Sequence, residues 1–276
     1  MSVHPVTGFR SRLFTASIFL FLVLFLLLVV ALIAADIGYV DLASVKEVLR
    51  SREIRSAAVL SLWTSTVTTA IAMVFAVPMG YALSRYRFPG RILADTIVDL
   101  PIVFPPLVVG LSLLVFFRTR VGLWLESMGL EFIYQRRGIV LAQFFVSASY
   151  GIRAIKTTFD EVDRRQEDVA LTLGCTRAQA FWRVAVRNAR QGIVAGAILT
   201  WARAIGLFGP LIVFVGAVRM KTEVLPTTVY LETSIGRIEV ALAIALLLIV
   251  IATVALILVR LLAYPRATPR SARRFW

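Results

Sequence analysis

Three charged side chains stand inside long apolar runs, where an unpaired charge is costly. Asp95 and Asp99 are four residues apart, so a helix would place both on one face. Arg203 lies near the middle of another apolar run. We expect the aspartates to form structural ion pairs with Arg85, Arg91 or Arg203 rather than to touch a substrate. Arg203 either pairs with one of these aspartates or offers a cation to a dianion that crosses the membrane.

Side chains suited to catalysis or metal binding are scarce. The chain has one cysteine, Cys175, and one histidine, His4, which excludes an intramolecular disulfide and most metal sites. It has no glycine-rich phosphate loop and no nucleophile beside a base. A membrane enzyme would need paired carboxylates or histidines at one depth, and only Asp95 and Asp99 come close. We therefore expect no catalytic residue, no cofactor and no metal, and predict that the chain is not an enzyme.

Composition places the chain in a membrane. Of its 276 residues 59% are hydrophobic, and the mean hydropathy is +0.85, although the net charge is +14. A soluble domain of this length does not bury so much apolar surface. We predict a multi-pass protein of a bacterial or archaeal plasma membrane, in contact with lipid. The placement of the basic residues explains the charge without nucleic acid.

Six apolar runs reach about the 20 residues that cross a bilayer. The predicted fold is therefore all-α, with a transmembrane domain over 13–262, an N-terminal tail over 1–12 and a basic tail over 263–276. The first run is longer than the core of a signal peptide, so it is expected to be retained. The predicted spans are 13–35, 57–83, 92–117, 138–159, 193–218 and 238–262.

Lysine and arginine counts orient these spans. If the N-terminus is inside, the inner segments hold eighteen basic residues and the outer segments eleven. The excess favours a cytoplasmic location for both termini and for the loop over 160–192. The segments 118–137 and 219–237 are then external. Residues 36–56 are external too, and their spacing indicates either a helix on the membrane surface or a solvated loop helix.

Two spans have unusual composition. The span over 57–83 carries hydroxyl and small residues that allow close helix packing, which suits a helix surrounded by protein. The span over 92–117 contains Pro101, Pro105 and Pro106, which free backbone carbonyl groups. Two interpretations remain open for the prolines: a broken helix that lines a path, or a simple kink.

The loop over 160–192 is the longest polar interruption. The stretch over 169–171 together with Leu173 is spaced like a helix face, and Gly174 breaks the pattern. A second helical face begins with Ala178, Phe181, Trp182 and Val184. A helix, a glycine turn and a second helix suggest an element that docks on a soluble partner. The alternative is an ordinary solvated loop between spans.

This loop resembles the cytoplasmic signature of binding-protein-dependent ABC importer permeases. In that family a Glu-Ala-Ala triplet precedes a glycine, and a Leu-Pro pair follows about a dozen residues later. Here Asp168-Val169-Ala170 stands at the triplet and Gly174 at the glycine, while Val186-Arg187 stands at the Leu-Pro pair. Asp for Glu is a mild departure, and Arg187 for Pro loosens the expected turn into the fifth span.

Softer matches point to a subgroup. The turn over 85–90 and the stretch over 99–110 look like those of molybdate, tungstate and sulfate permeases. The stretch over 201–209 is similar to the fifth-span motif of that subgroup, in which Glu is usual where Leu207 stands. The resemblance therefore implies import of an oxyanion. Importers of iron(III), phosphate or thiamine remain alternatives, as does an ion-driven secondary transporter without an ATPase.

The resemblance also implies partners and roles. A second permease subunit, as in a homodimer, would complete the pore, two cytoplasmic ATP-binding subunits would drive alternating access, and an extracytoplasmic binding protein would deliver the solute. The implied contacts with the ATPase are Asp168, Val169, Ala170, Gly174, Arg177 and Phe181. The translocation path or gate is expected to include Asp99, Pro101, Pro105, Pro106, Arg203, Phe208 and Gly209.

Overall fold

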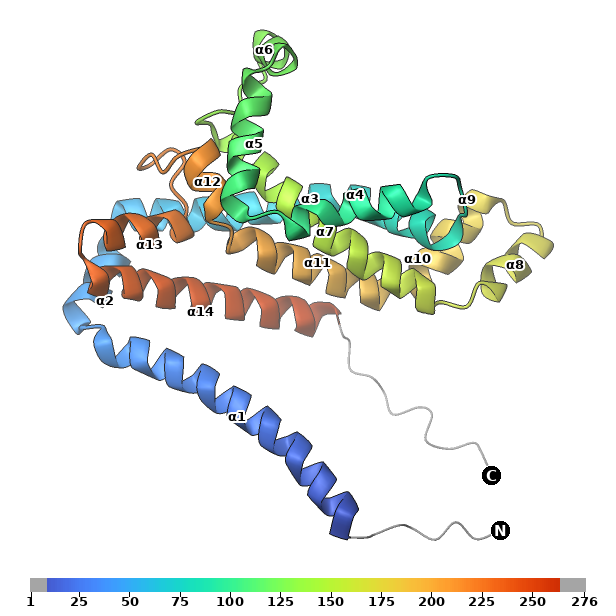
Figure 1. The fold of residues 1–276 in the computed structure, drawn as a ribbon, viewed down its shortest axis with the longest axis horizontal. Coiled ribbons are helices and arrows are strands. Elements are labelled where there is room, and N and C mark those ends of the chain that lie inside the picture. The colour runs from blue at the N-terminus through green and yellow to red at the C-terminus, as the bar shows by residue number, and fades with distance from the viewer. Residues whose placement is uncertain (1–8, 264–276) are drawn as a thin grey trace.

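The computed structural model describes residues 9–263, which form helices joined by short turns (Figure 1). The predicted all-α class is confirmed for this part of the chain. Residues 1–8, with His4, and residues 264–276 lie outside the described part, and they include most of the two predicted tails.

Four described helices are long and apolar enough to cross a membrane. They coincide with four of the predicted runs, because an uninterrupted apolar run of this length satisfies its backbone hydrogen bonds best as a helix. These helices are α1 (Phe9–Tyr39), α3 (Arg52–Arg85), α7 (Arg136–Glu161) and α14 (Ile238–Ala263).

The other two predicted spans are interrupted. The run over 92–117 forms α4 (Arg91–Val103) and α5 (Pro106–Arg118), which are bent by 110° and count as a fifth span only if taken together. Pro105 causes this break, since it lacks an N–H group and disfavours helical geometry at the preceding residue. Of the two interpretations left open for the prolines, the bend between α4 and α5 therefore supports the broken helix rather than the simple kink. The run over 193–218 forms α11 (Arg190–Ile205) and the short α12 (Gly209–Phe214).

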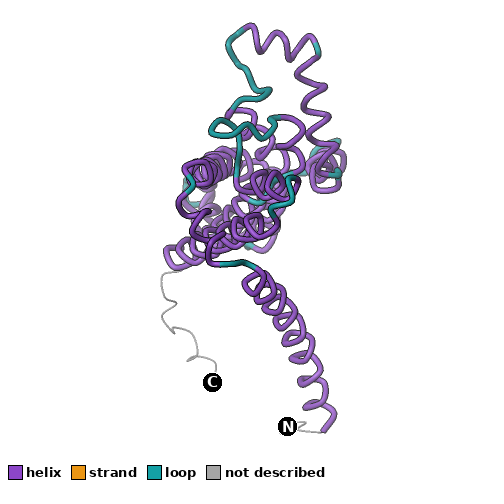
Figure 2. Tube along the Cα trace, turned by 90° about the vertical axis from the view of Figure 1, so that its left-hand side faces the viewer, coloured by secondary structure: helices purple, strands orange, loops and turns teal. Residues whose placement is uncertain are grey.

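The helix α7 lies at the centre of the bundle. It packs against α3, α11 and α4, while α14 lies beside α11 and α13 (Leu225–Ser234). One end of the bundle carries α8 (Arg165–Thr172), α9 (Arg177–Ala180) and α10 (Val186–Asn188), and the other carries α13 and α2 (Leu42–Arg50) (Figure 1). The helix α1 diverges from the bundle, and α5 with α6 (Arg120–Ser127) stands out from it (Figure 2).

Small and hydroxyl residues form the buried face of α3. They recur every three or four residues, so they share one side of the helix. The buried positions include Ser61, Thr64, Ser65, Thr68, Ala72, Ala76 and Gly80. The opposite face is open, with Val59 67% and Val74 71% exposed. The prediction that protein surrounds this helix therefore holds for one face only.

The segments between spans contain helices of their own. The predicted helix within 36–56 is α2, whose first turn is capped by Asp41: its Oδ1 accepts a hydrogen bond from Ser44 N at 2.7 Å. Hydrogen bonds from Ser44 also hold the pKa of Asp41 below its ordinary value. The segment over 118–137 contains α6, and the segment over 219–237 contains α13.

The close approach of α3 and α7 requires a glycine. A Cβ atom at Gly80 would lie 2.9 Å from Ile155 Cγ2 and 3.0 Å from Lys156 N. We predict that Gly80→Leu lowers the stability by about 1–3 kcal/mol through overpacking, seen as a lower melting temperature of the purified protein in detergent. Gly38→Leu is the control, because nothing lies within 4 Å of that position. Equal melting temperatures for both variants would contradict this packing.

Candidate functional site

The polar loop folds as a helix, a glycine turn and a second helical segment, as predicted. The first helix is α8 (Arg165–Thr172), and Gly174 follows with a positive φ of 89°. Thr176 then caps α9 (Arg177–Ala180), and its side chain and that of Gln179 each bond the other residue's backbone. A π-helical turn over Phe181–Ala185 and α10 (Val186–Asn188) lead into α11. The left-handed conformation at Gly174 suits glycine and reverses the chain between the two helices.

A buried ion pair attaches α8 to the end of α3. Arg85 Nε lies 2.9 Å from Glu167 Oε1, and both side chains are at most 8% exposed. The Tyr81 hydroxyl donates to Glu167 Oε2 at 2.6 Å. Arg85 also donates to the Val162 carbonyl at 2.9 Å, and Arg164 donates to the Arg85 carbonyl. The ends of α3, α7 and α8 are therefore held together by charge-assisted hydrogen bonds.

Aromatic rings extend this attachment to the second helical segment. The Tyr81 ring lies 4.7 Å from the Phe181 ring and 5.3 Å from the Phe159 ring, both edge-on. Phe159 is fully buried, and Phe181 packs on the same apolar cluster. On the other side, Asn188 donates to Gln166 at 2.5 Å. A displacement of α8 would therefore strain contacts on α3, α7 and the π-helical turn.

Apolar side chains are exposed on α8 and at the residue that ends it. Ala170 is buried, but Val169 is 56%, Leu171 39% and the C-cap Leu173 80% exposed. The exposed surface of α8 also carries polar side chains, namely Arg165, Gln166, Asp168 and Thr172. Three exposed apolar side chains at so short a helix favour a surface that another protein covers.

Two polar residues singled out from the sequence come together beside this surface. Asp168 and Arg177 both line a cavity of about 500 Å³ between α8, α9 and the end of α3. The acidic residue that holds α8 in place is Glu167, one position before the triplet identified from the sequence. Sequence reasoning missed it, although an acidic residue on the buried side of a short amphipathic helix is a usable signal.

A second candidate site lies where the two interrupted spans meet. A cavity of about 350 Å³ lies between the break of α4 and α5 and the break of α11 and α12. It contains five of the seven residues predicted for the path. Its lining is Pro105, Pro106, Leu107, Arg203, Gly206, Leu207, Phe208 and Gly209.

Glycines let the two breaks touch. A Cβ atom at Gly209 would lie 2.8 Å from Pro106 Cβ, and one at Gly110 would lie 2.9 Å from the Pro210 carbonyl oxygen. Leu207, which departs from the usual Glu of the subgroup motif, is 2% exposed and belongs to the same apolar cluster as Val109. An apolar side chain fits that buried position.

The predicted pairing of Arg203 with Asp95 or Asp99 is wrong. The Arg203 guanidinium carbon lies 5.4 Å from the centre of the Tyr150 ring, a cation–π contact. Its Nε atom is buried and has no hydrogen-bond partner among the described residues. A cation without a carboxylate therefore faces the cavity between the broken helices.

The aspartates of α4 pair with α7 instead. Arg153 Nε donates to Asp99 Oδ1 at 3.0 Å, and Lys156 Nζ lies 2.7 Å from Asp95 Oδ2. The prediction of a structural pairing is confirmed, but the predicted partners are not, because Arg85 is engaged by Glu167. The sequence offered a signal, since Arg153 and Lys156 are three residues apart and share a helix face.

This pairing separates the remaining path residues from the cavity. Asp99 forms its ion pair with α7, and Pro101 lies inside α4 before the break. The described residues contain no group of three or more His, Cys, Asp or Glu side chains that could hold a metal.

The fold and these two sites define a class of protein: a helical membrane subunit with a helix–turn–helix loop at one end and a cavity at paired helix breaks. Residues 72–264 match the family model described as binding-protein-dependent transport system inner membrane component. The chain belongs to this family, and it is the membrane permease subunit of an ABC importer.

Individual relatives support this family membership. The chain is 32% identical over 233 residues to the sulfate transport system permease protein CysT of Escherichia coli, covering 84% of this chain and 83% of that protein. It is 43% identical over 153 residues to the molybdate/tungstate transport system permease protein WtpB of Thermococcus kodakarensis, covering 55% and 58% of the two chains. A bacterial ABC transporter that imports alginate has the same fold, with a TM-score of 0.74 over 92% of this chain and 96% of that chain at 17% identity.

The buried ion pair can be tested against its exposed neighbour. Removing one partner of a buried pair leaves the other charge unpaired and costs about 3–5 kcal/mol. We predict that Glu167→Gln raises amide hydrogen exchange over 163–176 by roughly a hundredfold or more, since 1.4 kcal/mol is a factor of ten. Asp168→Asn, on the same helix but exposed, should leave exchange unchanged. Equal protection in the two variants would rule out Glu167 as the anchor.

Proposed function

We propose that this chain moves a tetrahedral oxyanion, molybdate, tungstate or sulfate, into the cell by alternating access. The observation that carries the proposal is Arg203, a cation without a carboxylate partner beside the cavity between two broken helices. Irregular backbone of this kind occurs inside a membrane only where it is buried in protein or lines a water-filled cavity, because lipid cannot satisfy its polar groups. The two relatives described above, a sulfate and a molybdate/tungstate permease, support the same class of solute.

The electrostatics of the cavity favour an anion. A cation in a weakly polar environment lowers the barrier for an anion and raises it for a cation. The N-terminus of α5 begins at Pro106, on the wall of the same cavity, and the positive end of its dipole adds to this field. Asp99, neutralised by Arg153, does not oppose it.

Coupling to ATP hydrolysis is assigned to the loop over 160–192. The exposed apolar residues of α8, with Asp168 and Arg177 beside them, would enter a groove on a cytoplasmic ATP-binding subunit. The pair of Arg85 and Glu167 would then transmit movement of that subunit to α3. The loop is stiff enough for this role because Thr176 caps α9, and because Glu167 attaches α8 to the end of α3, which is bonded in turn to the end of α7.

The assembly we propose has two copies of this permease, two ATP-binding subunits and an extracytoplasmic binding protein, in the cytoplasmic membrane of a bacterium or archaeon. With α4–α5 and α11–α12 counted as broken spans, the proposed topology has six spans, so that both termini and the coupling loop would lie on the same side, which we assign to the cytoplasm. Charge counting along the sequence supports this orientation.

Two alternatives make different demands. An importer of iron(III), phosphate or thiamine would share the coupling loop, but a cationic solute would be opposed by Arg203. An ion-driven transporter would need no ATPase, and therefore no exposed apolar side chains on α8. The family membership favours the ATP-driven reading.

Coupling is tested on the exposed face of α8. We predict that Val169→Gln with Leu173→Gln reduces copurification with the ATP-binding subunit, and the rate of transport, by at least about tenfold, because the double variant loses two apolar side chains that burial would remove from water. The control is Ala178→Gln on α9, which is also exposed. A double variant that binds its ATPase as tightly as the control would reject docking through α8.

Solute charge is tested at Arg203. We predict that Arg203→Gln lowers uptake of radiolabelled molybdate or sulfate by about tenfold or more, while Arg203→Lys, which keeps the charge, retains a measurable part of it. Copurification with the ATP-binding subunit should be unchanged. Undiminished oxyanion uptake by Arg203→Gln, or uptake of thiamine alone by the unaltered protein, would overturn the proposed solute class.

A further inference from the structure

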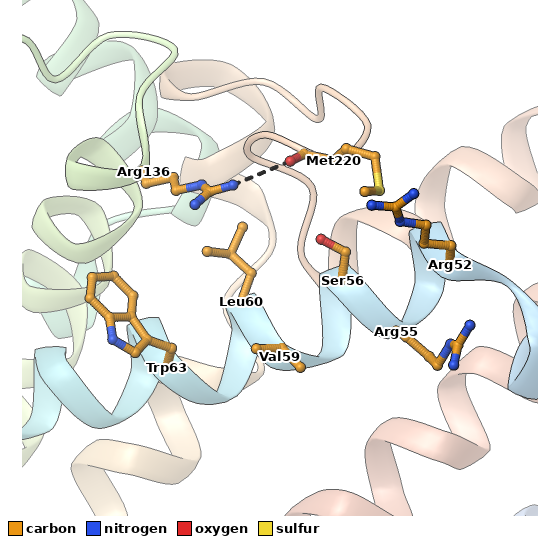
Figure 3. A pocket seen from close by; sticks show the side chains of 8 residues that line it. All are labelled: Arg52, Arg55, Ser56, Val59, Leu60, Trp63, Arg136 and Met220. Atoms are coloured by element: carbon orange, nitrogen blue, oxygen red, sulfur yellow. Dashed lines mark hydrogen bonds between the residues drawn. The ribbon is translucent and has the colours of Figure 1, made fainter.

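A cavity lined by three arginines lies at the end of α3 opposite the coupling loop. Its volume is about 750 Å³, and residues from α3 face Arg136 and Met220 across it (Figure 3). No carboxylate is among the residues that line it in the described part of the chain. The lining is Arg52, Arg55, Ser56, Val59, Leu60, Trp63, Arg136 and Met220.

The acidic residues nearby are already engaged. Arg219 forms ion pairs with Glu53 at 2.5 Å and with Glu232 at 3.1 Å. Arg237 forms ion pairs with Glu232 at 3.2 Å and with Glu47. These two arginines, outside the cavity, therefore pair with three of the carboxylates in this region. A fourth, Glu223, is buried and forms no ion pair within residues 9–263, and its burial raises the pKa of the carboxyl above its ordinary value.

The cavity arginines are bound only to neutral groups. Arg136 donates to the carbonyl groups of Lys221 at 3.0 Å and Met220 at 3.3 Å. Arg55 makes two longer bonds, of 3.4 Å, to carbonyl groups at the start of its helix. Arg52 makes no hydrogen bond or ion pair within residues 9–263. All three arginines are exposed, and none of them forms an ion pair with a carboxylate of residues 9–263.

An apolar groove continues from this cavity. A second cavity of about 720 Å³ shares Trp63 and Arg136 with the first and follows α3 and α7 toward the coupling loop. From Trp63 to Met79 its α3 wall spans sixteen residue steps, or about 24 Å of helix. This length exceeds half of the roughly 30 Å hydrocarbon core of a bilayer, so the groove is long enough for one acyl chain. The α3 side is formed by Val67, Ile71, Phe75 and Met79, and the α7 side by Val140, Phe144 and Phe145.

We propose that the two cavities together bind an anionic phospholipid. Its phosphate would lie among Arg52, Arg55 and Arg136, because guanidinium groups pair with phosphate oxygens through parallel hydrogen bonds. One acyl chain would lie in the groove between α3 and α7. Trp63, at the junction of the two cavities, has the amphipathic side chain that proteins place at the interface of head groups and hydrocarbon.

The shape of the site favours a lipid over other anions. A free oxyanion would fill only a small part of the arginine cavity and would leave the groove empty. A second copy of this chain could cover the groove, but it would have to bring carboxylates to the arginines. A phospholipid satisfies both cavities with one molecule, and the proposal is independent of the transported solute.

Native mass spectrometry of the full chain in neutral detergent tests the site. We expect phosphatidylglycerol to be retained at least about tenfold more strongly than phosphatidylcholine of the same acyl chains. Arg52→Gln with Arg136→Gln should abolish this preference. Arg118→Gln with Arg120→Gln is the matched control, since these arginines are exposed on α5 and α6 and line neither cavity. Equal retention of the two lipids, or a preference that survives the first pair of substitutions, overturns the proposal.

Two further arms separate the lipid from other occupants. Val67→Trp fills the groove and leaves the arginines in place, so it should weaken phosphatidylglycerol retention by a similar factor even if the arginine variant fails to fold. Sulfate or molybdate at millimolar concentration should not displace the lipid, and displacement would assign the cavity to a free oxyanion. Lipid adducts on monomers but never on dimers would assign the groove to a second copy of the chain.

Discussion

The buried pair of Arg85 and Glu167 is the contact on which the end of this permease that carries α8 depends. It joins the last turn of α3 to a helix of eight residues that could not hold its shape alone, since helices so short are marginal in water. Tyr81 and the Val162 carbonyl satisfy the remaining hydrogen-bonding groups of the pair. Because both charges are removed from water, the geometry is held strictly: a small displacement would leave an unpaired buried charge.

Within the bundle, some charged side chains form ion pairs that hold helices together, whereas Arg203 does not. The carboxylates of α4 are neutralised by Arg153 and Lys156 of α7, which fixes two helices side by side and removes their charge from the path. Arg203 is the exception, since it faces a cavity and rests on an aromatic ring rather than on a carboxylate. At the opposite end the arginines of the outer cavity also lack carboxylates. Both positions are places where a charge from outside the chain would complete the structure.

The helix breaks open a cavity in the bundle, which is the proposed path of the solute. Pro105 ends α4, and Gly206 ends α11 at the same level, so that α5 and α12 leave the bundle axis together. Gly209 against Pro106 and Gly110 against Pro210 let the two breaks touch backbone to backbone. A stripe of small side chains on α3 packs the rest of the bundle equally closely, which makes it stiff enough for a movement at α8 to reach the breaks.

The sequence alone determined the elements. Apolar runs of sufficient length fixed α1, α3, α7 and α14, the prolines marked the interruption near Pro105, and the spacing around Gly174 fixed the helix–turn–helix of the loop, because each depends on residues close together in the chain. Only the tertiary structure decided the pairing of charges: that Asp99 meets Arg153 rather than Arg203, and that Glu167 rather than Asp168 anchors α8. For each carboxylate, several basic residues lie at a similar depth in the membrane, and Coulomb attraction alone does not determine which of them becomes its partner. Helix packing determines the partner, because contacts between residues far apart in sequence set the rotation of each helix about its axis.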